Sequence, residues 1–192
     1  TDSDATVNEA GLATGSAAST NSEIDADGAI SASGGTGPYT FALTGSGAGT
    51  YGTLSLDADG SYTYTLNTRY DTTPDANNGA QTEENKDSFG YTVTDANGNT
   101  ATGTIYVDIV DDVPTAHADT NSVVEGGSVT GDVLTNDVFG ADGSTAGGGV
   151  VGVRAGGDTA TAATTGVGTA ITGQYGVLTL DADGDYSYAT TP

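Results

Sequence analysis

Apolar and polar side chains alternate along several short stretches of this chain. Residues 51–56 and 61–66 alternate in this way and are joined by an Asp-Ala-Asp-Gly tetrad at 57–60. A period of two residues is that of a β-strand with one buried face. A four-residue loop that ends in glycine is a good hairpin connection, because glycine permits positive φ. The pattern predicts a β-hairpin over residues 51–66.

The same alternation predicts a second hairpin, formed by residues 89–94 and 100–110 about an Asp-Ala-Asn-Gly tetrad at 95–98. Short strands are also expected at Val123–Val124 and over 129–134. No stretch has helical periodicity, and the many Gly, Thr, Val and Asn residues disfavour helix. The sequence therefore predicts an all-β fold. Strands at intervals of about ten residues favour an immunoglobulin-like β-sandwich over a closed barrel.

The chain contains an internal repeat. Residues 49–64 match residues 173–188, which lie 124 positions further along, and Glu9 matches Glu125 more weakly. A period above about 100 residues is too long for a solenoid unit and is typical of tandem β-sandwich domains. We therefore expect tandem immunoglobulin-like domains, a complete one over 1–113 and an incomplete one over 114–192.

The second domain has no counterpart of residues 87–109 of the first. We expect either that the chain has been cut at Pro192 or that the missing strands come from later in the protein. No basic start followed by an apolar stretch opens the sequence at Thr1, so a signal peptide is not indicated. We expect a piece of a longer protein.

The net charge of the chain excludes some classes of binding partner. The chain has 26 Asp and Glu residues against 3 Lys and Arg residues, a formal net charge of -23 at pH 7, and no cysteine. The electrostatic field of so large a negative charge repels nucleic acid and anionic lipid. No apolar run approaches the ~20 residues that span a bilayer. Divalent cations are the expected means of offsetting the repulsion. Bound metal can also stabilise the fold in place of the disulfides that the chain lacks.

Four stretches resemble the tandem immunoglobulin-like, cadherin-like and VCBS-type repeats of giant RTX adhesins, bacterial surface proteins exported by type I secretion. These stretches are residues 51–64, 87–98, 110–114 and 129–137. The resemblance implies an extracellular β-sandwich on the bacterial cell surface that folds and stiffens on calcium after export. Such repeats act as spacers that project a ligand-binding tip for cell adhesion or biofilm formation. The chain lacks the Gly-Gly-x-Gly-x-Asp nonapeptides of that family's secretion region.

Paired acids beside a glycine turn suit calcium, which prefers hard oxygen donors. Four tetrads supply such pairs: Asp25 and Asp27, Asp57 and Asp59, Asp95 and Asn97, and Asp181 and Asp183. Calcium needs 6 to 8 oxygens, so a second loop must complete each shell. The alternative is that these residues only form tight turns, because Asp, Asn and Gly favour turns without any metal.

The junction between the two domains is a stronger metal candidate. Asp111 and Asp112 are adjacent at the end of the predicted strand, and Asp119 and Glu125 follow within reach. Two neighbouring carboxylates repel each other unless they are solvated or bridged by a cation. We predict a calcium site here that stiffens the link between neighbouring repeats. The alternative is an exposed acidic linker.

No catalytic constellation is evident. His117 is the single histidine and there is no cysteine, which disfavours a histidine-rich zinc site and a cysteine nucleophile. The paired carboxylates occupy repeated turns and do not imply one cleft of the kind that glycoside hydrolysis needs. We expect a protein that is not an enzyme.

Aromatic residues and one long loop leave a second function open. Tyr62 and Tyr64 share one strand face, and this favours packing over stacking on a sugar. The loop 68–86, with Asp71, Asp75, Glu83 and Glu84, is the best place for a separate ligand or metal. The alternative to the spacer is therefore a module at the adhesin's distal end that binds a glycan or peptide on a host or biofilm surface. A third possibility is an accessory domain of a surface hydrolase.

Overall fold

The structure, a computed structural model, describes residues 5–70, 81–144 and 147–191. The predicted all-β class is confirmed, since strands make up 40% of the described residues and helix 2%. The chain forms two compact units. Unit 1 consists of residues 1–113 together with 140–142, and unit 2 consists of residues 114–139 and 143–192. No helix in the described ranges has the length and apolar character needed to cross a membrane.

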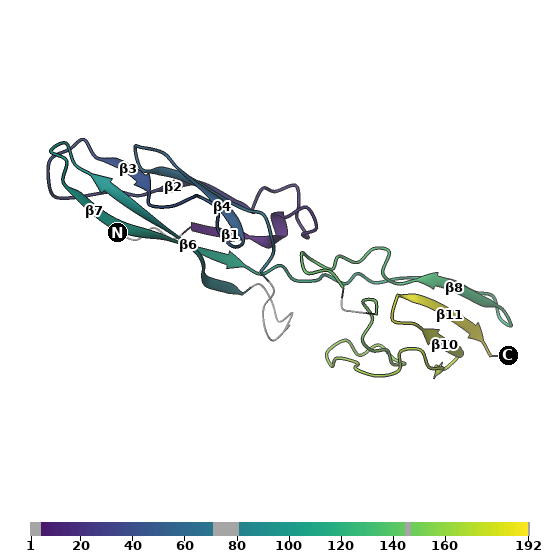
Figure 1. Ribbon diagram of the computed structural model, residues 1–192. Coiled ribbons are helices and arrows are strands. Elements are labelled where there is room, and N and C mark those ends of the chain that lie inside the picture. Colours follow the sequence, from purple (N-terminus) through teal and green to yellow (C-terminus); the bar gives the residue numbers. More distant parts are fainter. Residues whose placement is uncertain (1–4, 71–80, 145–146, 192) are drawn as a thin grey trace. The chain divides into compact units, whose positions relative to one another are not determined.

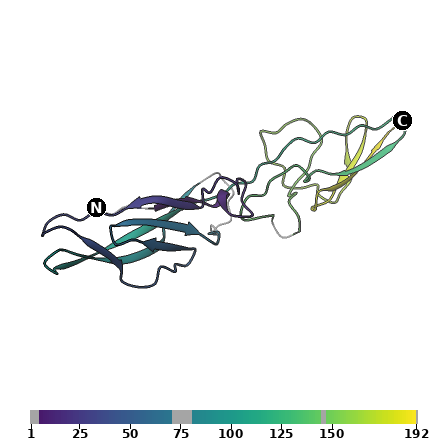
Figure 2. The same ribbon diagram turned by 90° about the horizontal axis from the view of Figure 1, so that it is seen from above.

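Unit 1 is a sandwich of two sheets (Figures 1 and 2). The first sheet has the order β1-β7-β6-β3, with β1 at Ala5–Asn8, β7 at Thr100–Val110, β6 at Thr82–Thr94 and β3 at Thr40–Leu43. The second sheet has the order β2-β5-β4, with β2 at Ile24–Ala29, β5 at Ser61–Leu66 and β4 at Gly52–Leu56. β1 runs parallel to β7, whereas the other pairs are antiparallel. A short 3-10 helix, η1 (Glu9–Gly11), follows β1.

The core of unit 1 lies between these sheets and follows from the alternation in the sequence. Tyr62 and Tyr64 point inward from β5 and are 3% and 0% exposed, and Leu54 of β4 is 2% exposed. The facing sheet contributes Phe89 of β6 and Ile105 of β7 to the same cluster. The tyrosine pair therefore packs in the core, as expected from its shared strand face.

A buried carboxylate joins the two sheets. Asp87 of β6 is 5% exposed and accepts hydrogen bonds from the Tyr64 hydroxyl at 2.7 Å and from the backbone N–H groups of Thr50, Tyr51 and Gly52 at 2.7, 3.0 and 3.1 Å. Burial of a carboxylate is costly unless its oxygens are hydrogen-bonded. Burial, followed by the bond to Asp87, raises the pKa of Tyr64, so its hydroxyl stays a donor.

Both predicted hairpins are confirmed. β4 and β5 pair through the turn at 57–60, and β6 and β7 pair through the turn at 95–98. β6 begins at Thr82, so the expected loop over 68–86 is shorter than the sequence indicated. Glu83 and Glu84 lie in this strand, while Asp71 and Asp75 lie outside the described residues.

The tetrad at 25–28 is not a turn, which corrects one expectation. It lies in β2, where a bulge between Asp25 and Gly28 shifts the register against β5. Gly28 faces Tyr62, and a Cβ at Gly28 would lie 2.1 Å from a ring carbon of that tyrosine. The glycine is therefore required by the aromatic ring beside it.

Unit 2 contains one sheet in its described residues. The order is β8-β11-β10-β9, with β8 at Ser128–Asp132, β11 at Asp185–Thr190, β10 at Gly176–Leu180 and β9 at Ile171–Thr172. The hairpin β10–β11 repeats β4–β5 as expected. Val123 and Val124 are not in a strand, and this corrects the prediction. The corresponding strand β1 of unit 1 is held by its pairing with β7, for which the described part of unit 2 has no counterpart.

Candidate metal centre

Three acidic side chains converge in unit 1. Glu9, Asp111 and Asp142 each offer a carboxylate oxygen, and these oxygens all lie within 4.8 Å of one another. The register explains the first two. β1 pairs in parallel with β7 so that Asn8 lies beside Val110, and the chain therefore places the next residues, Glu9 and Asp111, side by side. Asp142 comes from the short segment 140–142, which packs within unit 1.

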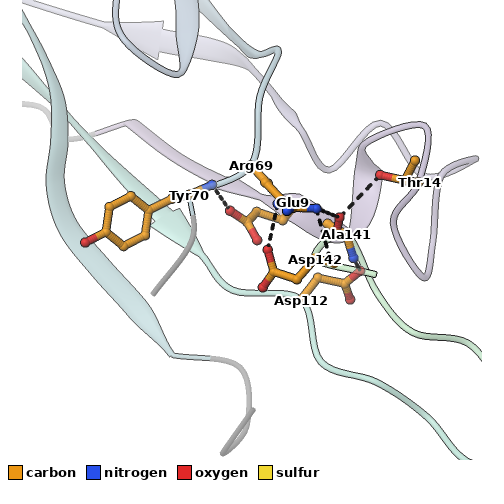
Figure 3. Close-up of polar contacts among 7 residues, drawn as sticks. All are labelled: Glu9, Thr14, Arg69, Tyr70, Asp112, Ala141 and Asp142. Atoms are coloured by element: carbon orange, nitrogen blue, oxygen red, sulfur yellow. Dashed lines mark hydrogen bonds and ion pairs between the residues drawn. The ribbon is translucent and has the colours of Figure 1, made fainter. Parts of the chain in front are cut away.

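Two of these carboxylates are buried and incompletely hydrogen-bonded. Glu9 is 0% exposed and Asp111 is 4% exposed. Glu9 Oε1 accepts a hydrogen bond from the backbone N–H of Tyr70 (Figure 3). Glu9 Oε2 and Asp111 Oδ1 have no hydrogen-bond partner among the described residues. Buried polar atoms are nearly always paired, and orphaned carboxylate oxygens that converge are the arrangement expected of a cation site.

The electrostatics of the group also favour a cation. Burial raises the pKa of Glu9 from 4.5 to about 7, and the nearby charges of Asp142 and Asp111 act in the same direction, while the Tyr70 N–H opposes them. Burial, followed by the charge of Asp142, raises the pKa of Asp111. Without a cation, ionisation of these carboxyls is therefore resisted by burial and by mutual repulsion.

Arg69 holds the third acid in place. Its Nε lies 3.1 Å from Asp142 Oδ1. Its Nη1 donates hydrogen bonds to the carbonyl oxygens of Ala141 and Asp142 at 3.2 and 2.9 Å (Figure 3). The guanidinium thus fixes both the backbone of this segment and the Asp142 side chain, and its charge offsets part of the repulsion among the acids.

Asp112 was predicted as a metal ligand and lies beside this group, but its oxygens bind the protein. Oδ2 accepts from the backbone N–H groups of Ser16 at 2.7 Å and Ala141 at 2.9 Å, and Oδ1 accepts from the Ser16 hydroxyl at 2.5 Å. The side chain is 5% exposed. Asp112 therefore anchors the segment 140–142 from the other side (Figure 3).

The acids of the two hairpin turns of unit 1 form local hydrogen bonds. Asp59 Oδ1 accepts from the hydroxyl of Ser61 at 2.6 Å and from its N–H at 3.0 Å, and the hydroxyl bond lowers the pKa of Asp59. Asp95 accepts from the Asn99 side chain at 2.9 Å and from the N–H groups of Asn97 and Asn99 at 2.9 and 2.8 Å. The Asn99 side-chain bond lowers the pKa of Asp95. These contacts are those of turns stabilised by Asp and Asn.

The other predicted ligands are not members of the group formed by Glu9, Asp111 and Asp142. Asp25 and Asp27 are in β2, Asp57 is in the β4–β5 turn, Asp181 and Asp183 are in the β10–β11 turn, and Asp119 and Glu125 are in unit 2. Within the described ranges they do not join a group of three converging acids. Metal binding at these positions, and at Asp59, Asp95 and Asn97, stays a prediction.

Sequence reasoning found Asp111 but missed Glu9 and Asp142 as candidate ligands. Glu9 had a usable signal, because it matches Glu125, which follows the strand expected at Val123–Val124. A parallel pairing of the equivalent strand before Glu9 with the strand before Asp111 would have brought the two acids together. Asp142 had no signal of this kind, because it reaches unit 1 through a loop that only the tertiary structure reveals.

Comparison with known proteins covers the first repeat. A family model described as "Bacterial cadherin-like domain" matches residues 1–111, which is more than half of the 192 residues. The match includes β1 to β7, Glu9 and Asp111, whereas Asp142 lies beyond it. No curated protein matches the chain. The chain belongs to the bacterial cadherin-like domain family.

Proposed function

We propose that this chain is a calcium-stabilised spacer segment of a large bacterial surface adhesin of the RTX type. Bacterial cadherin-like domains are structural or adhesion modules of extracellular and surface proteins and are typically not enzymes. The observation that carries the proposal is the convergence of the buried Glu9 and Asp111 with the half-buried Asp142, since one oxygen of Glu9 and one of Asp111 have no hydrogen-bond partner among the described residues.

The chemistry of the group fits calcium. All three side chains offer oxygen only, and hard oxygen donors are the ligands of Ca²⁺. Cadherin-like domains generally bind calcium. Three carboxylates are fewer than the 6 to 8 oxygens of a calcium shell, so backbone carbonyls or water would supply the remainder. The net charge of -23 gives a general reason for divalent cations to stabilise the compact state.

The position of Asp142 in the sequence gives a reason why a bound cation would stiffen the chain between neighbouring repeats. Asp142 belongs to the segment 140–142 of unit 1. The residues that flank this segment in the sequence, Phe139 and Gly143, belong to unit 2. A cation held by Glu9, Asp111 and Asp142 would therefore restrain the chain within one residue of unit 2. Such a restraint is what a spacer needs in order to resist bending between neighbouring repeats.

Calcium titration tests the proposal. We expect calcium to raise the melting temperature of the chain relative to chelator, because a ligand that binds only the folded state stabilises it, by about 2.7 kcal/mol at 100 times Kd. Glu9→Gln and Asp111→Asn should weaken calcium binding measured by calorimetry. Asp185→Asn is the matched control, since it removes one charge from an exposed position of β11 that is not a candidate ligand. A melting curve that is identical with calcium and with chelator would refute the proposal.

A second experiment separates the spacer from a ligand-binding module. Arrays of glycans and of peptides, probed with the chain in calcium and in chelator, should retain none of it if it is a spacer. Specific retention that depends on calcium would favour the module at the distal end of the adhesin.

A further inference from the structure

The sheet of unit 2 repeats one layer of unit 1. In the β4–β5 pair Leu54 lies opposite Tyr64, and in the β10–β11 pair Leu178 lies opposite Tyr188. Both members of the second pair are 124 positions beyond those of the first. The strand orders β2-β5-β4 and β8-β11-β10 place an equivalent third strand on the same side of the tyrosine strand.

This third strand carries the same glycine in both units. Gly28 of β2 faces Tyr62, and Gly131 of β8 faces Tyr186. An added Cβ would lie 2.1 Å from a ring carbon of Tyr62 in the first case and 2.7 Å from one of Tyr186 in the second. Each tyrosine ring therefore lies over the neighbouring strand in the same way, so the equivalence extends to the side chains.

The two layers differ in what covers them. In unit 1 the face with Tyr62 and Tyr64 is closed by the sheet that contains β6 and β7. In unit 2 the corresponding face is an open groove of about 270 Å³. Its apolar lining consists of Val123, Val129, Val133, Leu178, Leu180, Tyr186 and Tyr188, and the polar residues Asp119, Thr120 and Asn121 complete it.

Two residues of β6 make specific contacts with the tyrosine face as part of this cover. The ring of Phe89 lies with its centroid 5.9 Å from that of Tyr64. Asp87 accepts hydrogen bonds from the Tyr64 hydroxyl at 2.7 Å and from the N–H groups of Thr50 and Tyr51 at 2.7 and 3.0 Å. A strand with a carboxylate followed two positions later by an aromatic ring thus closes this face.

Unit 2 has the donors for such a carboxylate already in place. The corner before β10 repeats that before β4, since Gly173 N donates to Gly176 O at 2.8 Å as Gly49 N donates to Gly52 O at 2.8 Å. The counterparts of the donors to Asp87 are the hydroxyl of Tyr188 and the N–H groups of Gln174 and Tyr175. Within the part of unit 2 that is described, none of these three groups donates a hydrogen bond.

A strand partner is also missing on the other side of the groove. β1 of unit 1 ends just before Glu9 and pairs with β7. The stretch before the matching Glu125 forms no strand, and its Val124 is 79% exposed. The stretch before Glu125 therefore aligns with β1 in the repeat, but it lacks a strand like β7 to pair with.

We propose that the open face of unit 2 is an acceptor for a β-hairpin with the side-chain pattern of β6 and β7, supplied by the same polypeptide. Its first strand brings a carboxylate to Tyr188, Gln174 and Tyr175 and an aromatic ring over Tyr188. Its second strand pairs in parallel with the stretch before Glu125. A second copy of this chain cannot supply the hairpin without opening its own unit 1, because there Asp87 and Phe89 are 5% and 4% exposed.

The test extends the full chain at Pro192 with a copy of residues 69–113, which continues the alignment of the two repeats. We expect amide hydrogen exchange in β8, β10 and β11 to slow, and a new protected segment to form before Glu125. The matched control is the same extension with alanine in place of the aspartate and phenylalanine that correspond to Asp87 and Phe89. In this control the protection should be largely lost.

A pair of tyrosine variants tests the carboxylate contact. In the extended chain Tyr188→Phe should reduce the protection of β10 and β11 about tenfold or more, since it removes a buried hydrogen bond to a charged group. Tyr175→Phe removes a hydroxyl from a side chain that is 69% exposed and should change nothing. Equal exchange in the extended and original chains, or equal effects of the two tyrosine variants, would overturn the proposal. The result is independent of calcium binding at Glu9.

Discussion

The hydroxyl of Tyr64 donates a 2.7 Å hydrogen bond to Asp87, across the interface between the two sheets of unit 1. Asp87 also accepts three backbone N–H groups. Asp87→Ala should destabilise unit 1 by about 3 kcal/mol or more, because it leaves buried donors without an acceptor. Denaturant unfolding monitored by tyrosine fluorescence measures this. Asp59→Ala, in an exposed turn, should cost less than about 1 kcal/mol, and equal losses would show that the four bonds contribute little.

The stability of the calcium-free chain should fall as the pH rises from about 4.5 to 7. The folded-state pKa of Glu9, about 7, lies above its ordinary value of 4.5. The folded chain therefore holds this proton more tightly than the unfolded chain, and the stabilisation present below pH 4.5 is lost as the pH passes the folded-state pKa. The loss is at most about 3 kcal/mol.

Unfolding free energies measured in chelator between pH 5 and 8 check this pH dependence. Glu9→Gln should flatten it, because the amide does not titrate. Calcium should also flatten it, since a bound cation stabilises the carboxylate form. Stability that instead rises with pH over this range, in chelator, would contradict the assignment to Glu9.

Arg69→Ala should release the segment 140–142. The Ala141 amide donates to Asp112 and the Ala141 carbonyl accepts from Arg69, so we expect hydrogen exchange at this amide to accelerate about tenfold. Arg69→Lys should not restore protection, because an ammonium cannot reproduce the fork of the guanidinium. Arg154→Ala, which removes an equal charge from unit 2, serves as the control. The same acceleration in both alanine variants would indicate a general charge effect.

Gly28→Ala should destabilise unit 1 by about 1 to 3 kcal/mol, because the new methyl group overlaps the ring of Tyr62 and overpacking costs energy of this size. Gly45→Ala is the comparison, since nothing lies within 4 Å of an added Cβ there. This change should stay within about 1 kcal/mol of the original stability. Thermal melting distinguishes the two, and a benign Gly28→Ala would mean that the tyrosine ring moves freely.

The alternation of side chains was sufficient to predict the hairpins and the buried faces of Tyr62 and Tyr64. The local sequence could not show whether Asp25 to Gly28 forms a turn or a strand, because the glycine is required there by the ring of Tyr62 on the neighbouring strand. A local motif gives no information on a neighbour that is 34 positions away in sequence. The strand expected at Val123 and Val124 failed for a related reason, since a strand forms only where a partner is present.

The part of the candidate site that lies at the end of β7 was predictable from the sequence. Asp111 follows a long alternating stretch, and its position beside other acids was visible. Its neighbour Asp112 has the same local sequence context, yet it faces Ser16 and Ala141 instead. Adjacent residues on extended backbone point in opposite directions, and only the fold determines which direction leads to Glu9.

The inclusion of residues 140–142 in unit 1 has a practical consequence for anyone who excises the first repeat. A fragment that stops at Val113 retains β1 to β7 but loses Asp142 and the two carbonyl groups that Arg69 binds. The compact unit 1 therefore includes residues that lie beyond the end of the first repeat. A fragment cut at the repeat boundary would therefore lack one of the three converging carboxylates and the backbone segment that Arg69 and Asp112 hold.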